Sequence, residues 1–281
     1  MAGQAVTEAV ITEILDLAWQ KQTWAQTSIK HNVRMPESAS TADDWLPTPH
    51  GFTLGEALFQ DSTGLRAVLA GKNVLELGAG VANHSVLIYR MGVASLAMTE
   101  VNKERLATTR RVMSFNGCDD GTSYSVADWL HVSPCAATAD GRYDALVTNP
   151  PFCLSGKVNR RYFIDDFILN AHKVLRPGGL LVWVQSGMAD MNKTITRLEE
   201  NGWDAKIVLE KRYPWREYYY DDAAFLREAQ EVTDRGGKYP GFTVEEDISQ
   251  GTGGGTGEPR RIEQLFVVQA TLRPFTPHFC H

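Results

Sequence analysis

The chain has 281 residues, 43% of them hydrophobic, which is enough to bury the core of one large domain with appendages. A net charge of −6 argues against a protein that tracks nucleic acid by neutralising phosphates, although basic stretches at 157–161 and 211–216 leave a local contact open. No apolar run approaches the roughly 20 residues that span a bilayer, so no membrane partner is expected. The four cysteines lack metal-ligand spacing and the N-terminus lacks a signal-peptide pattern, so we predict no metal site and a cytoplasmic location.

Residues 1–50 are expected to form an N-terminal helix and cover segment, and residues 51–281 the main domain. Apolar side chains at helical spacing predict an amphipathic helix over residues 1–22. The polar segment from 23 to 44 could cover a ligand site or act as a linker. Residues 45–52 form a stiff aromatic stretch, either a wall of a ligand pocket or a packed connection.

Helical and strand patterns alternate from residue 53 onward, which predicts βαβ units and a mostly parallel sheet. The expected strands are 73–77, 95–99, 123–127, 144–148, 179–185, 204–210 and 264–272. The expected helices are 53–59, 63–70, 82–91, 102–116, 162–174, 191–201 and 221–235. In open α/β sheets, ligands bind at the carboxyl ends of the strands.

The most informative segment is Asn149-Pro150-Pro151-Phe152, which directly follows the strand expected at 144–148. Each proline fixes φ at about −65° and removes a backbone donor, and the residue before a proline is held extended. The result should be a stiff loop that presents the Asn149 amide, nearby carbonyls and the Phe152 ring. Such a loop can accept hydrogen bonds from a planar NH2 group and stack on its plane. The alternative is a proline turn that merely ends the strand.

A strand, a glycine turn and a helix follow one another around Glu76-Leu77-Gly78-Ala79-Gly80. This layout lets the backbone approach a nucleotide closely. The third glycine of the dinucleotide fingerprint is missing, because Asn83 stands there, and no P-loop Gly-Lys-Ser/Thr follows. Glu76 would repel a pyrophosphate but could bind a cation. His84, just after the turn, is expected on the helix surface.

Acidic residues end or follow the next two strands. Glu100 ends the strand at 95–99, where a carboxylate can accept two ribose hydroxyls. Asp128 follows the strand at 123–127 and could accept an exocyclic adenine amine, with Trp129 flanking the ring. Together with the glycine turn and the proline loop, in this order, they predict a nucleoside-binding site.

Over residues 50 to 210 the chain resembles the class I S-adenosylmethionine-dependent methyltransferases, in the branch with an Asn-Pro-Pro-Tyr/Phe motif. That branch includes methyltransferases of exocyclic base amines in RNA, guanine among them, and of glutamine in release factors. The resemblance implies a Rossmann-like α/β fold with a seven-stranded sheet, its last strand antiparallel and helices on both faces. It also implies S-adenosylmethionine as the cofactor. Glu76 to Gly80 would be the cofactor loop, Glu100 the ribose-binding acid, and Asn149, Pro150 and Phe152 the catalytic loop.

The residues suit transfer to a planar nitrogen, whose lone pair is delocalised. The Asn149 side-chain oxygen and the Pro150 carbonyl can hold both N–H bonds, and alignment does most of the remaining work. Phe152 would stack on the substrate or face its cationic character.

About fifty residues separate the last two expected strands, at about 213–262, and connections this long in compact domains tend to be functional or disordered. The insertion begins with Tyr213, Trp215 and Arg216, aromatic and basic side chains that we expect to bind a planar substrate. The same side chains could instead pack the insertion onto the sheet.

We therefore predict an N-methyltransferase, and a small molecule or free heterocycle as its substrate. An RNA base or a protein glutamine is the alternative substrate, and a non-catalytic cofactor-binding module is the alternative function. The intact Asn149 motif favours the enzyme.

Overall fold

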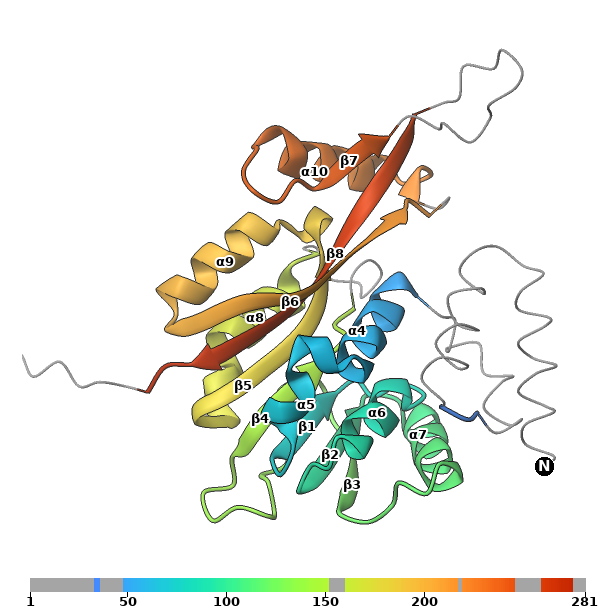
Figure 1. Cartoon of the computed structure of the whole chain (residues 1–281), viewed down its shortest axis with the longest axis vertical. Helices are drawn as coiled ribbons and strands as arrows, with labels where there is room; N and C mark the ends of the chain where they lie inside the picture. Colours follow the sequence, from blue (N-terminus) through green and yellow to red (C-terminus); the bar gives the residue numbers. More distant parts are fainter. Residues whose placement is uncertain (1–32, 36–47, 152–159, 217–218, 246–258, 275–281) are drawn as a thin grey trace, which may run out of the picture.

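The computed structural model describes residues 33–35, 48–151, 160–216, 219–245 and 259–274 (Figure 1). The helix predicted over residues 1–22 and the predicted catalytic residue Phe152 lie outside these residues.

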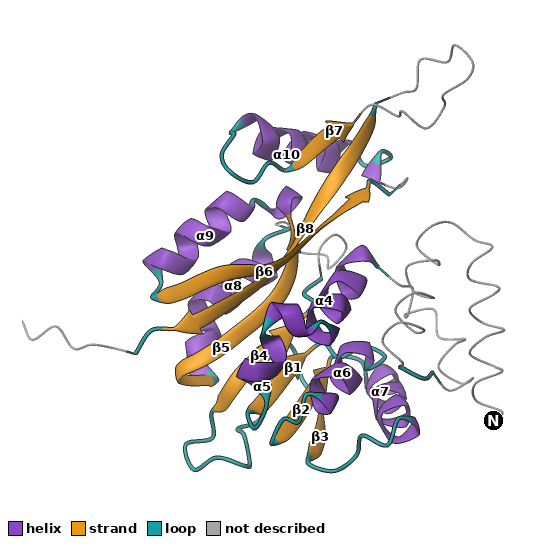
Figure 2. Ribbon diagram, viewed as in Figure 1, coloured by secondary structure: helices purple, strands orange, loops and turns teal. Residues whose placement is uncertain are grey.

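The described strands form one eight-stranded sheet in the order β3-β2-β1-β4-β5-β8-β6, with β7 added on β8 (Figure 2). The first five strands are parallel, and β8 runs antiparallel to β5, β6 and β7. This confirms the predicted mostly parallel sheet. The strands are β1 Asn73–Leu77, β2 Ser95–Glu100, β3 Thr122–Val126, β4 Tyr143–Thr148, β5 Leu175–Ser186, β6 Trp203–Pro214, β7 Phe242–Glu245 and β8 Arg260–Leu272.

Helices cover both faces of the sheet, and polar side chains cap several of them. Asn102 and Asp222, for example, accept hydrogen bonds from the first free backbone N–H groups of α7 and α10. The described α-helices are α4 Pro49–Phe59, α5 Leu65–Leu69, α6 Asn83–Arg90, α7 Lys103–Phe115, α8 Tyr162–Asn170, α9 Met191–Glu200 and α10 Ala223–Asp234.

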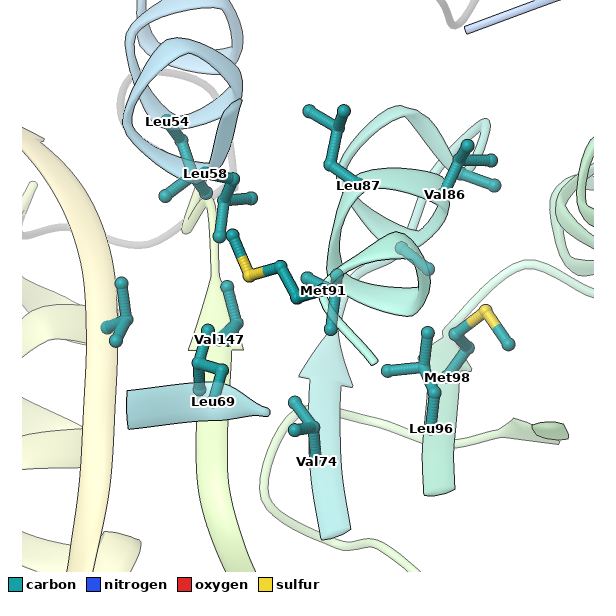
Figure 3. Packing of buried hydrophobic residues seen from close by; sticks show 14 of the residues in the cluster. Leu54, Leu58, Leu69, Val74, Val86, Leu87, Met91, Leu96, Met98 and Val147 are labelled. Carbon is teal, nitrogen blue, oxygen red and sulfur yellow. The ribbon is translucent and has the colours of Figure 1, made fainter. Parts of the chain in front are cut away.

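Successive residues of the central strands enter two different cores. Val147 of β4 packs with α4, α5 and α6 on one face, as Figure 3 shows for Leu54, Leu58 and Leu69. Its neighbour Leu146 packs with α8 and α9 on the other. Because a strand buried on both faces needs apolar residues on both, the middle of β4 is the uninterrupted apolar run Ala145-Leu146-Val147.

The insertion has its own structure, which only partly matches the prediction. The helix predicted at 221–235 is present as α10, but β7 was not predicted, and β6 and β8 are longer than expected. The register pairs Pro214 of β6 with Ile262 of β8, so the two strands extend as a long ribbon that carries β7. A third apolar cluster fills the space between this ribbon and α10.

The predicted boundary at residues 50 and 51 falls inside α4. Two described residues of the N-terminal segment, Val33 and Met35, pack in the same core as α4 and α6. Between them, the backbone of Arg34 exchanges two hydrogen bonds with the Asn116 side chain at the end of α7. The division into a cover segment and a main domain stays a prediction.

Candidate active site

A cavity of about 420 Å³ lies at the carboxyl ends of β1, β2 and β4. Its volume falls within the range of small-molecule and cofactor sites. The glycine turn, the ends of β2 and β4, the segment after β3 and the N-terminus of α4 all contribute to it. The lining residues are Thr48, His50, Leu77, Gly78, Gly80, Thr99, Glu100, Val101, Arg105, Ala127, Asp128, Trp129, Asn149, Pro150, Pro151, Phe163 and Arg216.

The glycine turn brings bare backbone to this cavity. Gly78 and Gly80 have φ values of 67° and 56°, which L side chains rarely adopt, and a Cβ at either would meet nothing within 4 Å. Between them, the Ala79 N–H donates to the Thr99 carbonyl at 2.9 Å, and the Ala79 side chain is buried in the core. Gly78 and Gly80 can therefore approach a ligand, whereas Ala79, predicted with them, fixes the turn to β2.

Glu76, a predicted ligand contact, lies beneath the turn and does not line the cavity. Its side chain is 2% exposed and accepts a hydrogen bond from the Ser85 hydroxyl at 2.5 Å. Burial raises the pKa of Glu76 to about 8, and the Ser85 hydrogen bond opposes this rise. The carboxyl group is therefore neutral at pH 7. The expectation that Glu76 could bind a cation is not supported, because burial keeps it uncharged.

Glu100 ends β2 with its carboxylate at the cavity, as predicted. One oxygen accepts a hydrogen bond from the Gly80 N–H at 3.2 Å, and the other from the Val101 N–H at 3.0 Å. Arg105 lies 3.4 Å from the second oxygen. These contacts fix the carboxylate between the glycine turn and α7, where it can accept hydroxyl groups of a ligand.

Asp128 and Trp129 also line the cavity, together with Phe163 of α8. Trp129 has a φ of 51°, and its ring lies 4.5 Å from that of Phe163. Its Nε1 is buried with no hydrogen-bond partner among the described residues. Since unpaired buried donors are costly, this N–H fits a site that a polar ligand completes.

Asn149 and Pro150 line the cavity at the end of β4. The first turn of α4 packs against Asn149, and a Cβ at Gly51 would lie 3.6 Å from its Nδ2. Thr48 caps this turn by accepting a hydrogen bond from the Gly51 N–H at 3.0 Å. The expectation of a pocket wall near residues 45–52 is thus met by Thr48 and His50, which lie at the start of a helix rather than in a loop.

His84, which we had expected on the helix surface, lies between α4 and β1 with its side chain only 13% exposed. Its Nε2 lies 2.8 Å from the Gly51 carbonyl, and its Nδ1 lies 3.9 Å from Glu76 Oε1. A carbonyl only accepts, so Nε2 carries the proton. Burial lowers the pKa of His84. The side chain therefore helps to hold the first turn of α4, and with it the wall next to Asn149.

The three predicted substrate residues of the insertion lie in different places. Arg216 is 6% exposed and lines the cavity. The Tyr213 hydroxyl lies 3.2 Å from Thr53 Oγ1, and Tyr213 is not among the residues that line the cavity. Trp215 is 5% exposed and packs edge-on against Tyr219 and Phe242 in the core of the insertion. Its position favours the packing role that the sequence left open, not substrate binding.

A buried polar cluster surrounds Arg216 at the cavity. Its Nη2 lies 3.3 Å from His50 Nδ1, and His50 Nε2 lies 3.7 Å from Glu263 Oε1. Because a guanidinium only donates, His50 Nδ1 accepts, and neutral His50 carries its proton on the side of Glu263. Burial and the charge of Arg216 lower the pKa of His50. Burial raises the pKa of Glu263 to about 7, against the attraction of Arg216.

The sequence analysis did not single out several of the lining residues, and it named Thr48 and His50 only as part of the stretch at 45–52. The residues it did not name are Thr99, Val101, Arg105, Ala127 and Phe163. A capping signal, Thr before Pro at the start of a helix, was present for Thr48. No local pattern marks His50 as a partner of Arg216, because the two residues are 166 positions apart.

The methyltransferase small domain family model matches residues 59–208, which is more than half of the chain. The chain belongs to this family. It is an S-adenosylmethionine-dependent methyltransferase with the Rossmann-like fold that the sequence predicted. The matched residues include the glycine turn, Glu100 and Asn149. The alternative of a non-catalytic module is not supported.

A Methanocaldococcus jannaschii protein, provisionally described as a protein N5-glutamine methyltransferase, is 22% identical over 161 residues, or 52% of this chain and 78% of that protein. A Pyrococcus horikoshii structure, provisionally described as an RNA methyltransferase, has a TM-score of 0.51 at 14% identity and covers 90% of this chain and 96% of its own. It shows the fold alone. A T. thermophilus 16S rRNA guanine N2 methyltransferase with bound AdoMet and guanosine has a TM-score of 0.46 at 21% identity, covering 80% of this chain and 43% of its own.

No helix within the described ranges combines the length and apolar character needed to cross a membrane.

Proposed function

We propose that this enzyme transfers a methyl group from S-adenosylmethionine to the nitrogen of a planar NH2 group in a macromolecule. The observation that carries the proposal is the place of Asn149 and Pro150, at the end of β4, in one cavity with the glycine turn and Glu100. A nucleoside-sized cofactor and an NH2 acceptor can meet only where these two sets of residues face the same space.

Five parts of the cavity fit the cofactor. Gly78 and Gly80 offer backbone without a side chain in the way, and Glu100 can accept the ribose hydroxyls. Asp128 can accept the adenine amine, and the half-buried Trp129 ring can flank the base. When bound, the cofactor supplies an electrophilic methyl group on a sulfonium.

Asn149 and Pro150 then hold the acceptor. The Asn149 side-chain oxygen and the Pro150 carbonyl accept the two N–H bonds of the target, which directs its lone pair at the methyl carbon. A C–N bond forms as the C–S bond breaks, and the nitrogen afterwards loses one proton to solvent. No titrating base is required, since the two acceptors stabilise the positive charge that develops on nitrogen.

Arg216 donates a hydrogen bond to the acceptor atom that shares a carbon with the target nitrogen. In an amide, or in the amidine edge of a purine, the carbon that bears NH2 also bears an acceptor, a carbonyl oxygen or a ring nitrogen. The Arg216 guanidinium lines the same cavity and only donates. The Arg216 donor beside the Asn149 and Pro150 acceptors complements an amide or amidine. A simple alkylamine, which has no acceptor next to its nitrogen, would leave the Arg216 donor unused.

Protein glutamine is the first candidate acceptor and an RNA base amine the second. The net charge of −6 disfavours binding through many phosphates, and the M. jannaschii relative is described as acting on protein glutamine. The comparisons give no support to the small-molecule substrate that the sequence analysis favoured.

The test is transfer of tritiated methyl from S-adenosylmethionine into a cell extract separated into protein, RNA and small-molecule fractions. Label in protein, recovered as N5-methylglutamine after enzymatic digestion, is the expected result. Label in RNA would select the second candidate, and label only in small molecules would contradict the proposal.

Asn149→Ala provides the mechanistic control, because it removes one acceptor while leaving the cofactor residues in place. It should abolish transfer and leave cofactor affinity, measured by calorimetry, within a few-fold of the wild type. Full activity of this variant would remove Asn149 from the mechanism.

A further inference from the structure

A continuous stack of side chains connects the insertion to the cavity. The Arg160 guanidinium lies 4.2 Å from the centroid of the Phe225 ring, and Phe225 stacks on Tyr219 at 4.4 Å with an interplanar angle of 24°. The Arg216 guanidinium lies 4.9 Å from the Tyr219 ring, and its Nη2 donates to the Tyr219 hydroxyl at 2.5 Å. We call these four residues, Arg160, Phe225, Tyr219 and Arg216, the α10 stack.

The stack is fixed at the end far from the cavity. Arg160 Nε lies 2.6 Å from Glu228 Oε2 of α10, and its Nη2 lies 3.9 Å from Asp222 Oδ2 at the helix cap. Phe225 and Tyr219 are each 1% exposed. The two buried rings, held between Arg160 and Arg216, have little room to move. In a close-packed interior, a displacement of one of these side chains displaces the next.

The chain on either side of the stack is also held in place. Next to Arg160, the Arg161 side chain donates to the backbone carbonyls of Ala189 and Asp190 at the start of α9. At the other end, the backbone N–H of Trp215 donates to the backbone carbonyl of Arg261 in β8 at 2.9 Å. Two ion pairs join the insertion to the main domain: Arg160 with Glu228, and Arg235 with Asp190 at 2.8 Å.

We propose that Tyr219 is a positioning residue that holds the Arg216 guanidinium toward the acceptor. On this proposal α10 supports the acceptor site, because its Phe225 ring packs against Tyr219. The proposal rests on the proposed function, in which Arg216 contacts the acceptor. Nη2 of Arg216 makes both of its contacts in this cluster, with His50 Nδ1 and with the Tyr219 hydroxyl. The hydroxyl fixes which way the fork of N–H groups points, because each N–H of a planar guanidinium has a set direction.

The test compares two hydroxyl deletions on neighbouring residues. Tyr219→Phe keeps the ring that stacks on Phe225 and removes only the acceptor for Arg216. Tyr220→Phe removes a hydroxyl from a side chain that is 43% exposed and serves as the matched control. For both variants, kcat/KM is measured with fresh, unlabelled material of the extract fraction that the wild type methylates. The Kd of S-adenosylmethionine is measured by calorimetry.

Tyr219→Phe is expected to lower kcat/KM for the acceptor about tenfold or more, the loss expected for one hydrogen bond to a charged group. The Kd of S-adenosylmethionine should stay within twofold, and Tyr220→Phe should change neither value. Glu228→Gln, at the far end of the stack, should give a smaller loss, and Glu231→Gln on the exposed side of α10 none. Unchanged kcat/KM in Tyr219→Phe would overturn the proposal.

Arg216→Ala separates this proposal from the proposed function. If Arg216→Ala loses acceptor turnover and Tyr219→Phe does not, only the positioning role fails. If Arg216→Ala keeps full turnover, the Arg216 contact itself is wrong, and the positioning role falls with it. If the wild type labels no fraction, the proposed function fails, and a crystal structure of Tyr219→Phe decides the rest. A displaced Arg216 guanidinium supports the stack, and an unmoved one refutes it.

Discussion

Glu76→Gln should make the protein more stable at neutral pH than the wild type. The Glu76 side chain is buried, receives the Ser85 hydroxyl, and has His84 as its neighbouring titratable base at 3.9 Å. Burial also lowers the pKa of His84, so no charge is supplied from that side. Glutamine has nearly the same shape as glutamate and keeps an oxygen that can accept the Ser85 hydrogen bond. Its amide does not ionise between about pH 4 and pH 9, so it adds no pH dependence.

The magnitude follows from the pKa of Glu76, which burial raises from an ordinary 4.5 to about 8. Below pH 4.5 the group is protonated in both the folded and the unfolded chain, so its protonation costs no stability. As the pH rises, the unfolded chain releases the proton and the folded chain keeps it until about pH 8. Stability is therefore lost across this window, by about 3 kcal/mol at pH 7 and under about 1 kcal/mol at pH 5.

Urea unfolding at pH 5, 6, 7 and 8 measures this effect. The difference in unfolding free energy between Glu76→Gln and the wild type should shift in favour of the variant by about 2–3 kcal/mol from pH 5 to pH 7. Glu231→Gln, which removes an exposed carboxylate from α10, should show no comparable shift. A difference that stays constant with pH would mean that Glu76 is ionised in the folded protein and would refute this reasoning.

Three further substitutions test the cofactor site, the wall next to Asn149 and the packing of the insertion. Glu100→Ala should weaken S-adenosylmethionine binding by about 1.5–3 kcal/mol in calorimetry, and unchanged affinity would contradict its assignment to the ribose. Gly51→Val should reduce methyl transfer and spare cofactor affinity, because a Cβ at this position would lie 3.6 Å from Asn149 Nδ2 and the two valine methyl groups would extend beyond it; Gly51→Ala is the tolerated control. Gly187→Ala should cost about 1–3 kcal/mol of unfolding free energy, because a Cβ there would lie 2.6 Å from the Pro240 carbonyl oxygen; equal stability by urea unfolding would show that the contact relaxes freely.

The sequence located the catalytic edge of the sheet because that edge is encoded locally. The bounds of β1, Asn73–Leu77, match the prediction, since an apolar strand that runs into a glycine turn is a contiguous signal. Asn149 was placed at the end of β4 by the prolines that follow it. These features depend on backbone conformation within a few residues, which a single sequence records directly.

The sequence could not decide which side chains of a local motif face the ligand. Glu76 and Ala79 belong to the glycine turn, yet the first is buried beneath it and the second is tied to β2. The four-residue strand β7 was missed for a related reason. Its partner, Arg260–Glu263 of β8, lies beyond an intervening stretch of chain, and strand pairing over such separations leaves no periodic trace.

The amino-acid sequence by itself determined the fold and the reaction class, and it located the loop that we propose holds the target nitrogen, because each depends on short segments whose conformation is set by their own residues. Only the tertiary structure decided the other wall of the site. It buried Trp215 in the insertion, turned Arg216 into the cavity, and brought His50 from α4 and Glu263 from β8 beside it. Contacts between residues far apart in the chain arise from the packing of whole elements, and their energies depend on burial that no local pattern specifies.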